Sequence, residues 1–135
     1  MGHPKEFLTG DYLTYERKYN ESGQGSPICR SCRLQNESIS HILTICSAYN
    51  TKRENIWKEI EALCLITKNN LNFEDIKSDE KQLTQFIIDP TSFNLQNRVH
   101  ISDPIVPAFF KLSRNLCNAI RKERTNILRE LSKKK

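Results

Sequence analysis

This sequence of 135 residues has no long hydrophobic run: no stretch approaches the roughly 18 consecutive apolar residues of a membrane span. We therefore expect no membrane association. It also lacks sustained alternation of polar and apolar residues, which argues against a substantial sheet. Hydrophobic residues make up only 37% of the chain, which is lean for a core, and a bound metal would add the stability that burial does not supply. The predicted fold class is mainly α.

A disulfide framework is also missing from the sequence. The five cysteines are an odd number with no signal peptide ahead of them, unlike a secreted disulfide-rich domain. We therefore expect an intracellular protein of the nucleus, the cytoplasm or both, where thiols stay reduced. Cys64 and Cys117 fall on helical stripes of apolar residues, where a free cysteine behaves as a small hydrophobe. Both are predicted to lie in the core.

The most informative feature is a cluster of three cysteines and one histidine. Cys29, Cys32, His41 and Cys46 form the pattern C-x2-C-x8-H-x4-C. The first two have the spacing of a tight turn, and the last two lie about one and a half helical turns apart, so a helical or kinked return could join all four. Zinc prefers such thiolate and imidazole ligands in a tetrahedron. We predict one Zn²⁺ per chain in a small knuckle-like loop; the competing interpretation is a set of buried or free thiols.

Basic residues gather at the C-terminal end. Residues 1–66 hold eight basic and eight acidic groups, residues 67–104 hold four and six, and residues 105–135 hold nine and two. Such asymmetry favours an anionic partner, most commonly nucleic acid, although a solvated helix face would look the same. The candidate contacts to RNA or DNA are Arg30, Arg33, Lys52, Arg53, Lys111, Arg114, Arg121, Lys122, Arg124 and Arg129.

The N-terminal half is expected to hold a helix within residues 5–19, followed by a linker at 20–27 that is rich in Gly and Ser. Ser38 is a candidate N-cap for a short helix that carries the last two ligands. A long amphipathic helix should follow, with Asn50 or Thr51 at its start. Its Trp57 is predicted to anchor the core against the metal loop.

The C-terminal half is expected to hold a turn of helix at 73–76, a helix at 79–88, an irregular stretch at 89–104 and a final helix at 105–131. His100, in the irregular stretch, is not expected to bind metal. The chain divides into an N-terminal helical segment with its linker (1–28), the zinc motif with its following helix (29–66) and a helical tail (67–135). The last two are expected to form one unit of several amphipathic helices.

Three blocks of the chain, in the same order, resemble the C-terminal region of reverse transcriptase polyproteins from non-LTR (LINE-like) retrotransposons. Phe7-Leu8-Thr9-Gly10 is similar to the L-T-G-H stretch ahead of that family's zinc motif, with Asp11 in place of the His. Ser40 to Cys46 resembles the family's E-H-L-L-x-C run, and the eight residues between Cys32 and His41 match its wider spacing. The segments at 86–92 and 112–124 are similar to the closing part of some animal elements.

The resemblance implies a module downstream of a polymerase that binds RNA or DNA and has no catalysis of its own. The reverse transcriptase portion would be present in cis or in trans. The sequence has no pair of adjacent Asp residues to hold two catalytic magnesium ions, and Asp79-Glu80-Lys81 lacks the spacing of a nuclease motif. The alternative is a structural or protein-interaction zinc module, whose final helix docks on a polymerase or another partner through Phe109, Leu112 and Leu116.

Overall fold

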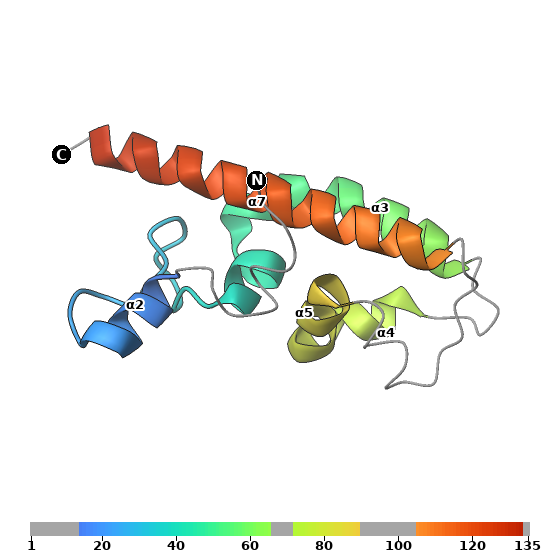
Figure 1. Cartoon of the computed structure of the whole chain (residues 1–135), viewed down its shortest axis with the longest axis horizontal. Helices are drawn as coiled ribbons and strands as arrows, with labels where there is room; N and C mark the ends of the chain where they lie inside the picture. The colour runs from blue at the N-terminus through green and yellow to red at the C-terminus, as the bar shows by residue number, and fades with distance from the viewer. Residues whose placement is uncertain (1–13, 66–71, 90–104, 134–135) are drawn as a thin grey trace.

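The computed structural model describes residues 14–65, 72–89 and 105–133, and these residues are mainly helical (Figure 1). The N-terminal part of the helix predicted within 5–19 lies outside the described residues, as do nearly all of the irregular stretch at 89–104 and His100. The elements are α2 (Tyr15–Ser22), a π-helical turn η1 (His41–Ile45), a 3-10 turn η2 (Ser47–Tyr49), α3 (Asn50–Leu65), α4 (Phe73–Lys77), α5 (Glu80–Ile88) and α7 (Ile105–Lys133).

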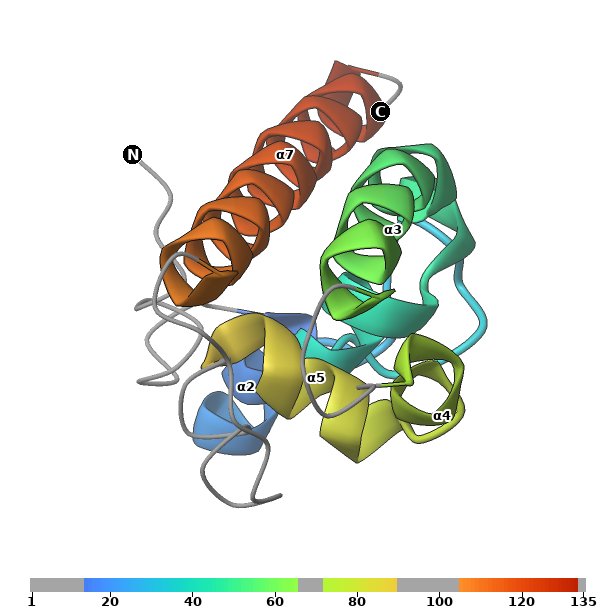
Figure 2. The same ribbon diagram turned by 90° about the vertical axis from the view of Figure 1, so that its right-hand side faces the viewer.

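Two long helices, α3 and α7, lie side by side and form one layer of the fold (Figures 1 and 2). Their facing sides are apolar: α3 contributes Ile60 and Cys64, and α7 contributes Leu116, Cys117 and Ile120, all buried. The predicted core positions of Cys64 and Cys117 are confirmed, and burial raises the pKa of each thiol to about 12. Both thiols therefore stay protonated and behave as apolar groups.

A row of aromatic rings joins the second layer to the first. Trp57 of α3 meets Phe73 of α4 edge to face, with ring centroids 5.6 Å apart. Phe73 in turn lies 6.1 Å from Phe86 of α5, which meets Phe109 of α7 at 5.2 Å. Such offset and edge-to-face pairs are the favoured aromatic geometries. Trp57, predicted as a core anchor, is half-buried against the core, and its ring contact is with Phe73 of α4.

Short polar side chains begin most of the shorter helices. Thr14 accepts from the amide of Arg17 at the start of α2, and Asn72 and Asp79 cap α4 and α5 in the same way. Gly23 ends α2 in the left-handed conformation, φ 69°, which glycine adopts without a steric penalty. Helix α2 therefore continues to Ser22, three residues into the segment predicted as a linker.

The predicted fold class is confirmed for the described residues, which form helices and no strand, with a Cys/His cluster in a small loop. The one strand-like pairing among them is an isolated antiparallel bridge between Ile28 and Asn36. None of the described helices is both long enough and apolar enough to span a bilayer.

Candidate metal centre

A tight hairpin presents the first two cysteines. The backbone closes through Cys29 N, which donates to Gln35 O at 2.8 Å, and through Arg33 N, which donates to Cys29 O at 2.8 Å. Arg33 takes the left-handed conformation, φ 61°, which a non-glycine residue adopts at some cost. The loop between Ile28 and Asn36, which form the isolated bridge, therefore turns sharply enough to direct the thiols of Cys29 and Cys32 to the same side.

A π-helical turn presents the other two ligands. Ser38 Oγ accepts from His41 N at 3.0 Å, which confirms the predicted cap. Cys46 N donates to His41 O at 2.8 Å, five residues back, as in a π-turn. In an α-helix, side chains five residues apart would point about 140° away from each other. The wider turn of η1 reduces that angle and brings His41 and Cys46 to one face.

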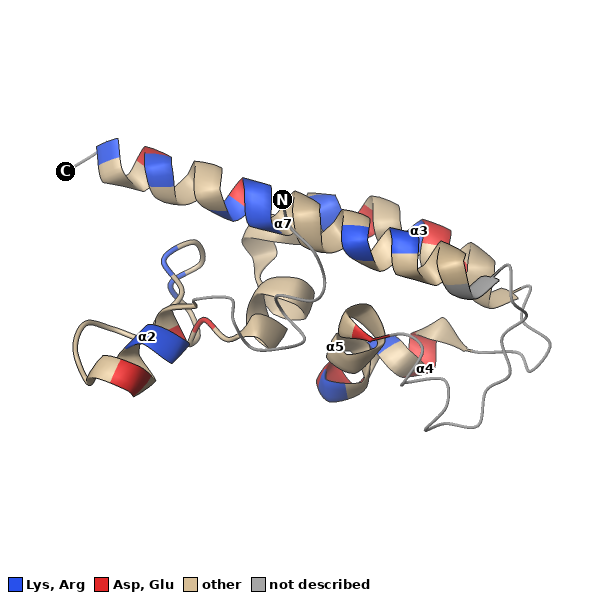
Figure 3. Cartoon of the chain, viewed as in Figure 1, with Lys and Arg blue, Asp and Glu red and all other residues tan. Residues whose placement is uncertain are grey.

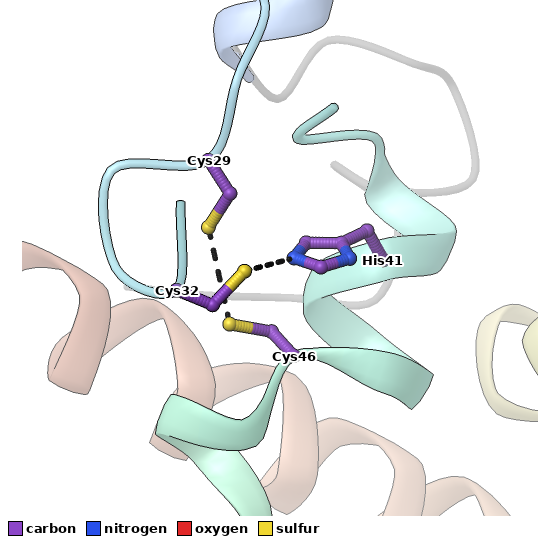
Figure 4. Close-up of side chains that lie close together, drawn as sticks. All are labelled: Cys29, Cys32, His41 and Cys46. Carbon is purple, nitrogen blue, oxygen red and sulfur yellow. Dashed lines mark hydrogen bonds between the residues drawn. The ribbon is translucent and has the colours of Figure 1, made fainter. Parts of the chain in front are cut away.

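These two segments place all four predicted ligands together (Figure 4). Their ligand atoms lie within 4.8 Å of one another, with Cys29 Sγ 3.8 Å from Cys46 Sγ and Cys32 Sγ 3.3 Å from His41 Nε2. Two sulfurs bonded to one zinc ion at tetrahedral angles lie about 3.8 Å apart, whereas a disulfide has sulfurs about 2.0 Å apart. The cysteines are free thiols, and the cluster is compatible with a bound metal.

Neighbouring groups prepare the cluster to bind a cation. Gln35 Oε1 lies 3.3 Å from His41 Nδ1, so the ring's hydrogen sits on Nδ1 and the Nε2 lone pair faces the thiols. Hydrogen bonding from Cys46 lowers the pKa of Cys29 to about 4, and the same contact raises the pKa of Cys46. A thiolate is thus available in the cluster at neutral pH, which is the form that binds metal.

Glu37, which was not among the site residues predicted from the sequence, lies beside the cluster and is fully buried. Its Oε2 is 4.0 Å from Cys29 Sγ, and both of its oxygens accept from Arg124 of α7, at 2.6 Å (Oε1) and 2.9 Å (Oε2). Arg124 is only 8% exposed and was wrongly included among the candidate phosphate contacts. A partner 87 residues away in sequence explains why no local pattern revealed this pair.

Arg53 is the second correction among the predicted contacts. It is 2% exposed, and its guanidinium donates to the carbonyls of Leu43 at 2.8 Å and Ile42 at 2.9 Å and to Asn50 Oδ1 at 2.9 Å. These carbonyls belong to η1, whose wide turn leaves them without the usual α-helical partners. Arg53 therefore holds η1 against α3 and does not reach solvent.

The other predicted contacts lie at the surface. Arg30, Arg33, Lys52, Lys111, Arg114, Lys122 and Arg129 are exposed, and Arg121 is half-buried. Lys52 Nζ is 3.9 Å from Glu123 of α7. Arg30 sits over the ring of Tyr15, 4.2 Å from its centroid.

Basic residues recur along most of the length of α7 (Figure 3), and most of them lie on one side of the helix. At about 100° per residue, five of them fall within an arc of about 100° that spans about 27 Å along the axis. They are Lys111, Arg114, Arg121, Lys122 and Arg129. The two acidic residues of α7, Glu123 and Glu130, point elsewhere and pair with Lys52 and Lys133. We call the five residues the basic stripe; it lies opposite the face that holds Leu116 and Ile120.

No protein-family model, no curated protein and no solved structure matches this chain. The function of the centre is therefore inferred from its own residues.

Proposed function

We propose that the chain is a zinc-binding module that binds RNA or DNA without catalysis of its own, as part of a retrotransposon-derived reverse transcriptase. The observation that carries the nucleic-acid half is the segregation of the basic stripe on the solvent face of α7. The Cys/His cluster carries the metal half. The resemblance to LINE-like polyproteins supports both, with the polymerase portion supplied in cis or in trans.

Zinc is the metal that the donor set favours. Three sulfurs and one imidazole nitrogen suit a borderline-soft ion with tetrahedral preference, and hard cations such as Mg²⁺ prefer oxygen ligands. Cys29, Cys46 and His41 are buried and Cys32 is partly buried, as in a closed structural site without an open coordination position. Zinc bound by all four residues would cross-link the hairpin to η1 and so hold the loop that carries Arg30 and Arg33.

The basic stripe suits the regularly charged backbone of a nucleic acid. A row of cations about 27 Å long on a straight helix can contact several phosphates at once. The acidic residues on the same helix already have basic partners, so they oppose such contacts little. Phosphate contacts would dominate the affinity, which should then fall steeply with salt.

The test is a salt titration of binding to a labelled RNA hairpin and to a labelled DNA duplex. We expect Lys111→Gln, Arg114→Gln and Lys122→Gln, combined in one variant, to reduce the slope of log K against log salt by about 2 to 3. These side chains are exposed, so the folded structure should survive their loss. Fluorescence anisotropy at several salt concentrations measures the slope.

The matched control removes three exposed cations from other helices: Lys18→Gln, Lys58→Gln and Lys81→Gln, on α2, α3 and α5. It makes the same change in net charge but leaves the stripe intact. We expect its slope to change by less than 1, because remote charges release few counterions. Equal slopes for the two variants would mean that net charge and not the stripe binds the nucleic acid, and the proposal would be wrong.

The fold weakens the main argument for a protein-interaction module, which was that the final helix has an uncovered apolar stripe. The apolar stripe on the final helix was expected to need a partner, but Phe109 and Leu116 are buried within the chain and Leu112 packs against the same core. The outer face of α7 that remains is mainly charged and polar, although it also carries Phe110, which is 42% exposed. It favours an anionic ligand over an apolar protein surface.

A further inference from the structure

The buried Glu37 connects the metal cluster to two helices. Its backbone belongs to the hairpin, because Glu37 N donates to Pro27 O at 2.8 Å. Its Oε1 accepts from Tyr15 N of α2 at 2.9 Å as well as from Arg124 of α7. Its Oε2 lies 4.0 Å from Cys29 Sγ, the first ligand. The hairpin, α2 and α7 thus meet at one carboxylate next to the cluster.

Charge balance makes Arg124 necessary at this point. A zinc ion with three thiolates and one neutral imidazole has a net charge of about −1. Glu37 adds a second buried negative charge 4.0 Å from one of the sulfurs. The two-point contact with the guanidinium of Arg124 offsets one of these charges, and planar two-point pairs of this kind are strong and geometrically specific.

We propose that Glu37 and Arg124 are positioning residues that couple metal binding to the seating of α7. This inference rests on metal binding at the Cys/His cluster. Arg124 keeps Glu37 neutralised and in place, which favours the negatively charged metal centre. By linkage, metal binding strengthens the hold of Glu37 on α7 by the same factor. The half of α7 that carries Lys122 and Arg129 is thereby fixed against the metal loop, and the pair connects the two halves of the proposed function.

The test compares Arg124→Gln with Arg129→Gln in the full chain. Both remove one guanidinium from α7, but Arg129 is exposed and lies about 140° around the helix from Arg124. We expect Arg124→Gln to weaken the affinity for Zn²⁺ at least tenfold in competition with a chromogenic chelator, and Arg129→Gln to change it less than twofold. Equal affinities would overturn the coupling while leaving metal binding itself intact.

A general loss of stability would also weaken metal binding, so a second readout is needed. With Co²⁺ in place of zinc, the thiolate-to-metal absorption band reports the charge beside the sulfurs. We expect Arg124→Gln to shift this band. Ile76→Val, a change in the buried face of α4, which packs against α3 and α5, should lower stability without shifting it. An unshifted band in Arg124→Gln would mean that the Glu37–Arg124 pair stabilises the fold without acting on the metal centre, and the proposal would be wrong.

If Arg124→Gln does not fold, Arg124→Lys and Arg129→Lys decide the question. Lysine keeps the charge but cannot make the planar two-point contact with Glu37. We expect Arg124→Lys to lower zinc affinity at least threefold and to shift the Co²⁺ band, and Arg129→Lys to do neither. If the two lysine variants are the same in both measurements, the proposal is wrong. Absence of metal binding in the unaltered protein would instead refute the proposed metal site.

Discussion

Cys32→Ser is expected to abolish zinc binding and to remove much of the helical signal of the protein. Serine places a weakly binding hydroxyl where the Cys32 sulfur faces His41 Nε2, and three ligands hold a structural zinc far less tightly than four. Binding energy at such a site is folding energy, with about 10 kcal/mol or more at stake in small zinc domains. Metal per chain, from native mass spectrometry, and far-UV circular dichroism during a chelator titration measure both effects.

The matched control is Cys117→Ala. Cys117 is fully buried between α7 and its neighbours, and its sulfur belongs to the core. Its loss should cost about 1 to 2 kcal/mol of unfolding free energy through the small cavity left behind, and the variant should keep one zinc per chain. A Cys32→Ser protein with an unchanged melting curve would show that the cluster has no structural role.

The sequence predicted most of the helices because their signals are local. The final helix was expected at 105–131 and is observed as Ile105–Lys133, since its apolar residues recur at helical spacing over its whole length. Asp79 marks the start of α5 by the same short-range chemistry that makes it a good N-cap. The four metal ligands were found for a similar reason, because their spacing within 18 residues is a local pattern.

The sequence did not predict which charged residues lie inside. Arg53 and Arg124 were grouped with the surface cations, because arginine is almost never fully buried unless it is paired. Their partners are the carbonyls of η1 and the carboxylate of Glu37, and neither pairing follows from spacing along the chain. Similarly, the preference of Trp57 for Phe73 depends on how α4 folds back on α3, which is a tertiary contact.

These corrections narrow the proposed nucleic-acid surface. Eight of the ten predicted contacts remain at or near the surface, and five of these form the basic stripe on α7. Lys52 lies outside the stripe and pairs with Glu123 of α7 at 3.9 Å. The two buried arginines instead stabilise the metal loop, and a loss of binding in their variants would therefore report a loss of structure.

Arg53→Met tests whether Arg53 stabilises the metal loop or contacts nucleic acid, and it is the second variant for which we expect a large effect. Methionine keeps much of the volume but leaves the carbonyls of Leu43 and Ile42 without their donors, and hydrogen bonds from a charged group to buried acceptors contribute about 1.5 to 3 kcal/mol each. We expect the zinc-loaded variant to lose about 3 kcal/mol or more of unfolding free energy in urea. Lys52→Gln, its exposed neighbour, should lose less than about 0.5 kcal/mol.

Binding of the labelled RNA hairpin then separates structure from contact. The folded fraction of Arg53→Met should bind with the same salt slope as the unaltered protein, because this guanidinium lies under η1 and reaches no phosphate. A slope that falls by about 1 in Arg53→Met, with stability unchanged, would return Arg53 to the nucleic-acid surface and contradict its buried position. The pair of measurements thus assigns the residue to one role, because burial against two carbonyls and contact with a phosphate exclude each other.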